Sequence, residues 1–97
     1  MTWKRGQRKE TDVFTDLGFK PAKAEELRIR SAMMRALVQH VRESRLTQAR
    51  AAAMFGVSQP RVSDLMRGKI HLFSVGNLIK LLAAAGLRVD LRVRKVA

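Results

Sequence analysis

The sequence predicts a single all-α domain of four or five helices that ends in a short β-strand. Apolar residues recur at helical spacing from about residue 21 to residue 85. Capping residues and glycines divide that stretch into segments of helical length. Only the last segment alternates apolar with charged residues, as a strand does. Ninety-seven residues, 46% of them apolar, suffice for one small core.

Composition divides the chain into a basic N-terminal arm at residues 1–12, a helical domain at residues 13–86 and a terminal strand at residues 87–97. The first ten residues carry four Lys and Arg against one acid, so we expect the arm to be flexible. Residues 11–19 are more apolar and slightly acidic. We expect them to form a short turn or a single helical turn that packs Phe14 and Leu17 onto the domain.

A long helix is predicted from Pro21 to Arg45. Proline is tolerated in a first helical turn, and Glu25 and Glu26 lie where negative charge suits the positive end of the helix dipole. One stripe of this helix is apolar at helical spacing and should face the core. Its members are Leu27, Met34, Leu37, Val38 and Val41.

Residues 46–69 predict two short helices joined by a tight turn. Thr47 can cap the first helix, because its side-chain oxygen can accept amide protons of the opening turn. Gly56 ends that helix, since glycine enters the left-handed conformation at little cost. Ser58 offers a second N-cap, and Pro60 lies in the first turn of the second helix, where its missing N–H is not needed.

The second short helix has one apolar face, formed by Val62, Leu65 and Met66 at helical spacing. The residues left on its outer face are Gln59, Arg61, Ser63 and Asp64. Two helices of this length around a three-residue turn containing glycine have the form of a helix-turn-helix.

A short connector is predicted at residues 70–73, after the helix-turn-helix. The next helix is capped by Ser74 and ends near Ala85; it is apolar around much of its circumference, so we expect it to contact both its own core and a second chain.

The last segment changes period at residues 87–94, where Leu and Val alternate with Arg and Asp. A lone strand leaves its backbone groups unpaired, so it needs a partner. That partner is the region near Val13, the same strand of a second copy, or a strand of another protein. We favour pairing between two copies across a twofold axis, which predicts a homodimer.

Charge and residue content limit the function. A folded domain with a net charge of +12 should attract polyanions or an acidic protein. No cysteine is present, which excludes disulfides and thiolate metal sites. We find no metal-ligand cluster, no nucleophile–His–acid grouping and no glycine-rich phosphate loop, and so expect neither an enzyme nor a cofactor. There is no apolar stretch of membrane-spanning length and no export signal, which fits a bacterial cytoplasm.

A helix-turn-helix and this charge together favour double-stranded DNA as the partner. The second helix would enter the major groove, where base edges carry a distinguishable pattern of donors and acceptors. Gln59 can pair with adenine and Arg61 with guanine, and Ser63 can add a smaller contact. Asp64 can accept from a cytosine amino group, or instead orient Arg61 or Arg67.

Phosphate contacts would fix the position of these helices on the duplex without reading sequence. The residues we expect to make them lie at helix N-termini or just after the second helix: Thr47, Gln48, Ser58, Arg67 and Lys69. Nonspecific RNA binding is a weaker alternative, because the chain lacks an exposed aromatic platform.

The motif L-T-Q-A at residues 46–49, followed by A-A-x-x-F-G-V-S-Q-P-x-V-S-x-L-x-x-G at residues 51–68, resembles the Cro/CI-type helix-turn-helix of phage repressors, the XRE family. The flanking V-F-x-D-L-G-F at residues 13–19 and L-R-V-D-L-R-V-R at residues 87–94 resemble a group of short HigA-like bacterial antitoxins.

This resemblance implies a five-helix lambda-repressor-like fold and a dimer that binds an operator of two half-sites and represses its own operon. It also implies a toxin partner similar to the RelE/HigB ribonucleases; the alternative is a stand-alone phage-type regulator without a toxin. By resemblance, Gln59 reads a base and Gln48 contacts phosphate. Pro60 departs from the family pattern, since some relatives have a base-contacting polar residue there.

Overall fold

The computed structural model describes residues 10–96, and within them it forms five α-helices and one 3₁₀-helix. The elements are α1 (Glu10–Asp16), α2 (Pro21–Glu43), α3 (Gln48–Phe55), α4 (Gln59–Met66), the 3₁₀-helix η1 (Ile70–Leu72) and α5 (Val75–Ala84). The prediction of an all-α domain with five helices is therefore confirmed. The predicted arm at residues 1–12 falls mostly outside the described residues, although α1 begins within it, at Glu10.

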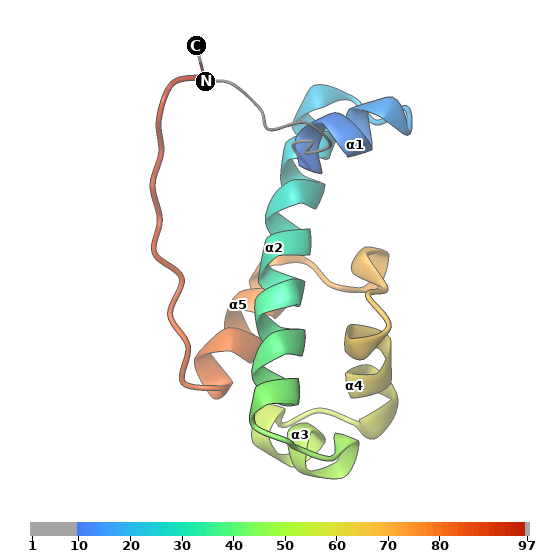
Figure 1. The fold of residues 1–97 in the computed structure, drawn as a ribbon, viewed down its shortest axis with the longest axis vertical. Coiled ribbons are helices and arrows are strands. Elements are labelled where there is room, and N and C mark those ends of the chain that lie inside the picture. The colour runs from blue at the N-terminus through green and yellow to red at the C-terminus, as the bar shows by residue number, and fades with distance from the viewer. Residues whose placement is uncertain (1–9, 97) are drawn as a thin grey trace.

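Helix α2 forms the long axis of the molecule, and the other helices are arranged around it (Figure 1). Helix α1 packs at its N-terminal end, α3 lies at its C-terminal end, and α4 and α5 lie along it. The core is where these helices meet. Its largest fully buried side chains are Leu37 of α2, Val62 and Leu65 of α4, Phe73 just before α5, and Leu78 of α5. Phe73 lies between η1 and α5, so the connector supplies the core's largest side chain.

Helix α2 ends two residues earlier than predicted, at Glu43. Arg45 adopts a left-handed conformation, with φ at 53°, which no α-helix can continue through. The Leu46 N–H then donates to the Val41 carbonyl at 3.2 Å and closes the helix end. This reversal sends the chain directly into α3.

Residues 10–16 form about two turns of helix, which is longer than the short turn or single helical turn expected. Phe14 is half-buried and meets Phe19 edge to face, with ring centroids 6.3 Å apart. Leu17 does not pack onto the domain as predicted, since it is 69% exposed. Together with Val13 and Phe19 it leaves apolar surface at this end of the molecule.

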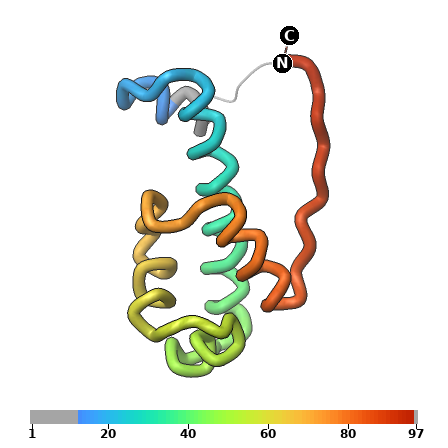
Figure 2. Tube along the Cα trace, turned by 180° about the vertical axis from the view of Figure 1, so that it is seen from behind, coloured from blue at the N-terminus to red at the C-terminus, as the bar shows by residue number. Residues whose placement is uncertain are grey.

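The predicted C-terminal β-strand is not formed in the single chain. Residues 88–96 are extended and run as an isolated arm away from the end of α5 (Figure 2). A strand requires a neighbouring segment to accept and donate its backbone hydrogen bonds. The region near Val13, one of the partners considered, lies in α1 and offers no such edge. We call residues 87–96 the tail.

Candidate nucleic-acid interface

Two side-chain caps and one glycine define the helix-turn-helix, as the sequence predicts. The Thr47 hydroxyl oxygen accepts from the Arg50 N–H at 3.1 Å, and the Ser58 hydroxyl oxygen accepts from the Arg61 N–H at 3.3 Å. Gly56 ends α3 in the left-handed conformation, with φ at 69°. Because each of these features is local, the start of α4 follows from the residues around it.

The two helices are held against each other by small and branched side chains. Ala51 and Ala52 of α3 are buried, and they allow the backbone of a neighbouring helix to approach closely. Phe55 of α3 is buried in the same core cluster as Val62 and Leu65 of α4. Helix α4 is thus fixed on one side and exposed on the other.

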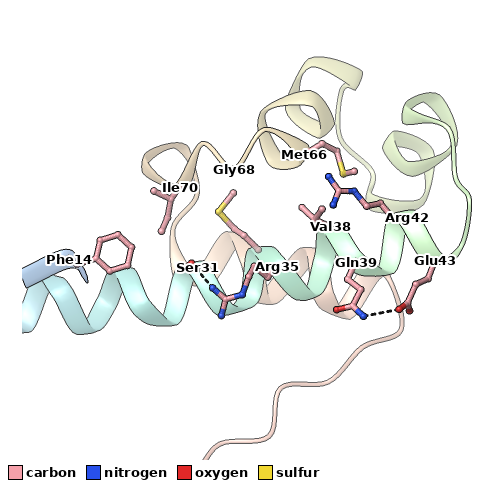
Figure 3. Close-up of a pocket in the computed structure, with 11 residues that line it drawn as sticks. Phe14, Ser31, Arg35, Val38, Gln39, Arg42, Glu43, Met66, Gly68 and Ile70 are labelled. Atoms are coloured by element: carbon pink, nitrogen blue, oxygen red, sulfur yellow. Dashed lines mark hydrogen bonds between the residues drawn. The ribbon is translucent and has the colours of Figure 1, made fainter. Parts of the chain in front are cut away.

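Met66 was predicted to complete the buried face of α4, but it is only half-buried. It lines a cavity of about 630 Å³ between α2 and the C-terminal end of α4 (Figure 3). Met34, Val38 and Ile70 supply apolar lining there. Arg35, which donates to the Ser31 hydroxyl at 3.0 Å, lies on the α2 wall. The incomplete burial of Met66 follows from its position beside this space.

The four predicted base-reading residues fall into different environments. Gln59, the first residue of α4, is exposed, whereas Ser63 and Asp64 one turn later are half-buried. Asp64 makes an ion pair with Lys69, whose Nζ lies 3.4 Å from its Oδ1. It therefore does not orient Arg61 or Arg67 in this structure. Lys69, a predicted phosphate contact, is partly neutralised by the same pair.

Arg61 does not extend freely from the outer face of α4. Its Nη1 donates to the Leu72 carbonyl oxygen at 2.7 Å, and its guanidinium carbon lies 3.9 Å from the centre of the Phe73 ring. These contacts tie the first turn of α4 to the junction of η1 and α5. A guanidinium carries five N–H donors, so a single carbonyl leaves others for a ligand. No local pattern around Arg61 indicates this contact, because its partners lie 11 and 12 residues away in the sequence.

The predicted phosphate contacts lie at the ends of the two helices. Gln48 is exposed at the first position of α3, and Arg67 is exposed at the C-terminal cap of α4. Thr47 and Ser58 use their oxygens as helix caps, but each hydroxyl still has a proton to donate. Sequence reasoning missed Arg50, which is exposed in the first turn of α3. Arg50 could have been identified from the sequence as a phosphate contact, because it is a basic residue in the first turn of the first helix of the motif.

Positive charge is distributed unevenly over the described residues. In residues 44–86 a single acid, Asp64, faces six Lys and Arg. On α2, by contrast, acids pair with bases: Lys23 with Glu26 at 3.0 Å, Arg28 with Glu25 at 2.6 Å, and Arg30 with Glu26. The hydrogen bond from Lys23, together with the nearby charge of Arg30, lowers the pKa of Glu26. The excess positive charge therefore lies mainly in residues 44–86, which contain the helix-turn-helix, and in the tail.

No group of three or more His, Asp or Glu side chains suited to hold a metal ion occurs among residues 10–96. Within the same range, every helix is too short or too polar to cross a lipid bilayer.

Comparison with known proteins agrees with this geometry. A family model described as "Helix-turn-helix domain" matches residues 13–94. A solved structure named "Putative XRE Family Transcriptional Regulator" shares 39% sequence identity with this chain, at a TM-score of 0.71. The match covers 76% of this chain and 83% of that one. No curated protein matches. The chain therefore belongs to the helix-turn-helix domain family and is a DNA-binding transcriptional regulator of the XRE type.

Proposed function

We propose that this chain is a sequence-specific repressor that binds an operator of two half-sites as a homodimer. The observation that supports this most directly is the exposure of Gln59 at the start of α4, whose Val62 and Leu65 are buried in the core. A helix fixed on one face and exposed at its N-terminal end can enter a major groove without losing its packing. The surplus of basic residues around it supports binding to phosphate.

In this proposal the base-reading residues are Gln59, Arg61, Ser63 and Asp64. Gln59 would pair with adenine, and Arg61 with guanine. Arg61 would read with those N–H groups that Leu72 does not occupy, so the ring of Phe73 and the Leu72 carbonyl would hold its guanidinium in place. Asp64 would have to leave Lys69, 3.4 Å away, to accept from a cytosine amino group.

Phosphate binding is assigned to Thr47, Gln48, Ser58, Arg67 and Lys69, with Arg50 added from its exposed position in α3. These contacts would give affinity and salt dependence but no sequence preference. The proposed action is binding alone, without catalysis, a metal or a cofactor.

Footprinting on DNA from upstream of the gene tests the repressor proposal. We expect two protected half-sites about one helical turn, or roughly 34 Å, apart. R61A should weaken binding by about 1–3 kcal/mol and relax the preference at one base position. R67A is the matched control on the same helix-turn-helix, because Arg67 is exposed at the C-terminal cap of α4. It should weaken all sequences alike and reduce the salt slope. Binding that is indifferent to sequence at physiological salt would contradict the proposal.

We also propose that the chain is the antitoxin of a type II pair and that it autoregulates the operon. The residues that support this are the V-F-x-D-L-G-F segment and the tail, which resemble those of HigA-like antitoxins. The first of these segments exposes Val13, Leu17 and Phe19 on the outer side of α1 and the turn after it. An apolar cluster of this kind can serve as a protein contact.

Co-expression with the product of an adjacent gene tests the antitoxin proposal. We expect a small RelE/HigB-like ribonuclease to co-purify with the wild-type chain, and L17D to weaken that complex while leaving operator binding unchanged. N77D, a control at an exposed position of α5, should leave the complex intact. If no such neighbour exists, or if it does not bind, the chain is a stand-alone phage-type regulator.

A further inference from the structure

Among the residues that the structure describes, the tail has the backbone with the fewest hydrogen bonds. Across residues 88–96, within the part of the chain that the structure describes, no backbone hydrogen bond links the tail to another segment. Leu91, Val93 and Val96 are each at least 85% exposed. Extended backbone with free donors and acceptors is a template for pairing with another strand. The tail therefore presents both hydrogen-bonding groups and apolar side chains to a partner.

We infer that two copies of the tail pair as antiparallel strands, with the twofold axis passing through Leu91. The inference rests on the proposed homodimer and specifies the surface and the register that form it. In this register, residue 87 of one copy lies opposite residue 95 of the other, and nine residues of each chain are paired. The strand predicted from sequence then forms only in the dimer.

Charge decides the direction of the strands. One side of the extended tail carries Arg88, Asp90, Arg92 and Arg94. Parallel pairing in register would place each of these opposite its own copy, so every facing pair would carry like charges. Like charges directly opposite each other destabilise a sheet. Antiparallel pairing can place Asp90 of one copy opposite a base of the other.

Charge and length together decide the register. With the axis at Leu91, Asp90 faces Arg92 of the second copy twice, and Val89 faces Val93 twice. An axis at Asp90 or Arg92 would set two identical charges opposite each other at the centre. An axis at Val89 would leave only residues 86–92 in the ribbon, because α5 and its cap occupy the residues before Gly86. Arg88 faces Arg94 in the favoured register, but near the ends, where long side chains can separate into solvent.

The apolar side of the paired tails would lie against an apolar groove formed by α2, α5 and the tail. A space of about 890 Å³ lies between the tail, α2 and α5. Ile29 and Met33 of α2 line it together with Val75 and Ile79 of α5, and Ile79 is 47% exposed. Val89 also lines this space, and Val93 of the second copy would lie beside Val89. Each copy would thus cover part of the other's apolar groove.

Single cysteines test the register, because the chain has no cysteine of its own. Facing residues of antiparallel strands have Cα atoms about 4.5–5.5 Å apart, within the range of a disulfide. L91C should therefore form a disulfide-linked dimer in nearly all chains under mild oxidation. V89C and V93C are the matched controls: four residues of strand, about 14 Å, separate each thiol from its counterpart. A mixture of V89C with V93C should crosslink to each other.

Charge reversal tests the facing pairs independently. D90R and R92D should each raise the dimer dissociation constant on the order of tenfold, since each turns two attractive pairs into two repulsive ones. The double variant D90R/R92D restores opposite charges and should restore dimerisation. R92D also lowers the net positive charge, so repulsion between the whole molecules would predict a tighter dimer for it. Sedimentation equilibrium measures all three constants.

The results separate this inference from the proposals on which it rests. Efficient crosslinking of V89C or V93C alone, or failure of the double variant to recover, would refute the Leu91 register while leaving a homodimer in place. A wild-type chain that is monomeric at every concentration would refute both the register and the dimer. Sequence preference for a single half-site, measured with D90R, tests DNA recognition separately from pairing.

Discussion

The helix-turn-helix and the tail are built on opposite principles. In residues 47–66 the helix ends are capped by side chains or closed by glycine, and the apolar face is buried in the core. The tail has neither: from residue 88 on, no backbone hydrogen bond joins it to the rest of the described chain, and Leu91, Val93 and Val96 are exposed. The helix-turn-helix closes its helix ends and buries its apolar face within one chain, whereas the tail needs a second chain to pair its backbone and cover its apolar side chains. We expect substitutions in the first region to change stability and those in the tail to change association.

The sharpest contrast should come from F73A, because Phe73, although it lies after residues 47–66, belongs to the same buried cluster as Val62 and Leu65. Phe73 is fully buried, and Arg61 covers its ring, so truncation leaves a cavity and removes a cation–π contact. We expect a loss of about 3–5 kcal/mol in the free energy of unfolding, measured by urea denaturation. V96A, at an 85% exposed position of the tail, should change it by less than about 0.5 kcal/mol. Equal effects would mean that the tail packs onto its own domain.

The next largest effect should come from G56A at the turn of the helix-turn-helix. Gly56 has a φ of 69°, and a side chain in this conformation costs about 1–2 kcal/mol. Gly76 in α5 is the matched control, because it lies in a helix and an added Cβ would meet only the Ser74 hydroxyl, at 3.9 Å. G76A should therefore raise stability, by up to about 1 kcal/mol. Opposite signs for the two variants in thermal unfolding would support this reading, and the same sign would contradict it.

A smaller effect should follow removal of the α4 cap. S58A deletes the hydroxyl that accepts from the Arg61 N–H at 3.3 Å, and we expect it to cost about 1 kcal/mol of unfolding free energy. S63A, within the same helix, removes a hydroxyl that caps no helix end and should cost less. Hydrogen exchange at the first turn of α4 should also speed up in S58A alone. No difference between the two variants would show that core packing alone fixes the start of α4.

The smallest effect should be the pH dependence contributed by Glu26, outside both regions. Its pKa is lowered in the folded chain by the hydrogen bond from Lys23 and by nearby Arg30, against an ordinary value of 4.5. The carboxylate therefore stabilises the fold above about pH 4.5 and loses this contribution as the pH falls through the lowered pKa. E26Q should lose stability at pH 7, and its difference from the wild type should shrink as the pH falls below 4.5 and through the lowered pKa. E43Q, which removes the carboxylate at the C-terminal end of the same helix, is the control for urea unfolding across this pH range.

Much of the fold followed from the sequence, because the signals that define a helix end lie within three or four residues of it. Thr47, Gly56 and Ser58 were assigned correctly for this reason. The extra length of α1 and the exposure of Leu17 were not predicted. Whether an apolar residue at the edge of a small domain is covered depends on what lies beside it, and a local pattern does not specify that.

What the sequence determined by itself is the helix-turn-helix: its caps, its turn, its buried face and the exposed Gln59 at the start of α4. Only the tertiary structure decided how the charged side chains are engaged. Arg61 was predicted to extend outward, yet it lies against Phe73 and Leu72, and Asp64 pairs with Lys69. The tail pattern is strand-like, but one chain supplies no second edge for it. Local conformation depends on neighbouring residues, whereas ion pairs, ring contacts and strand pairing depend on segments that only the folded or assembled chain brings together.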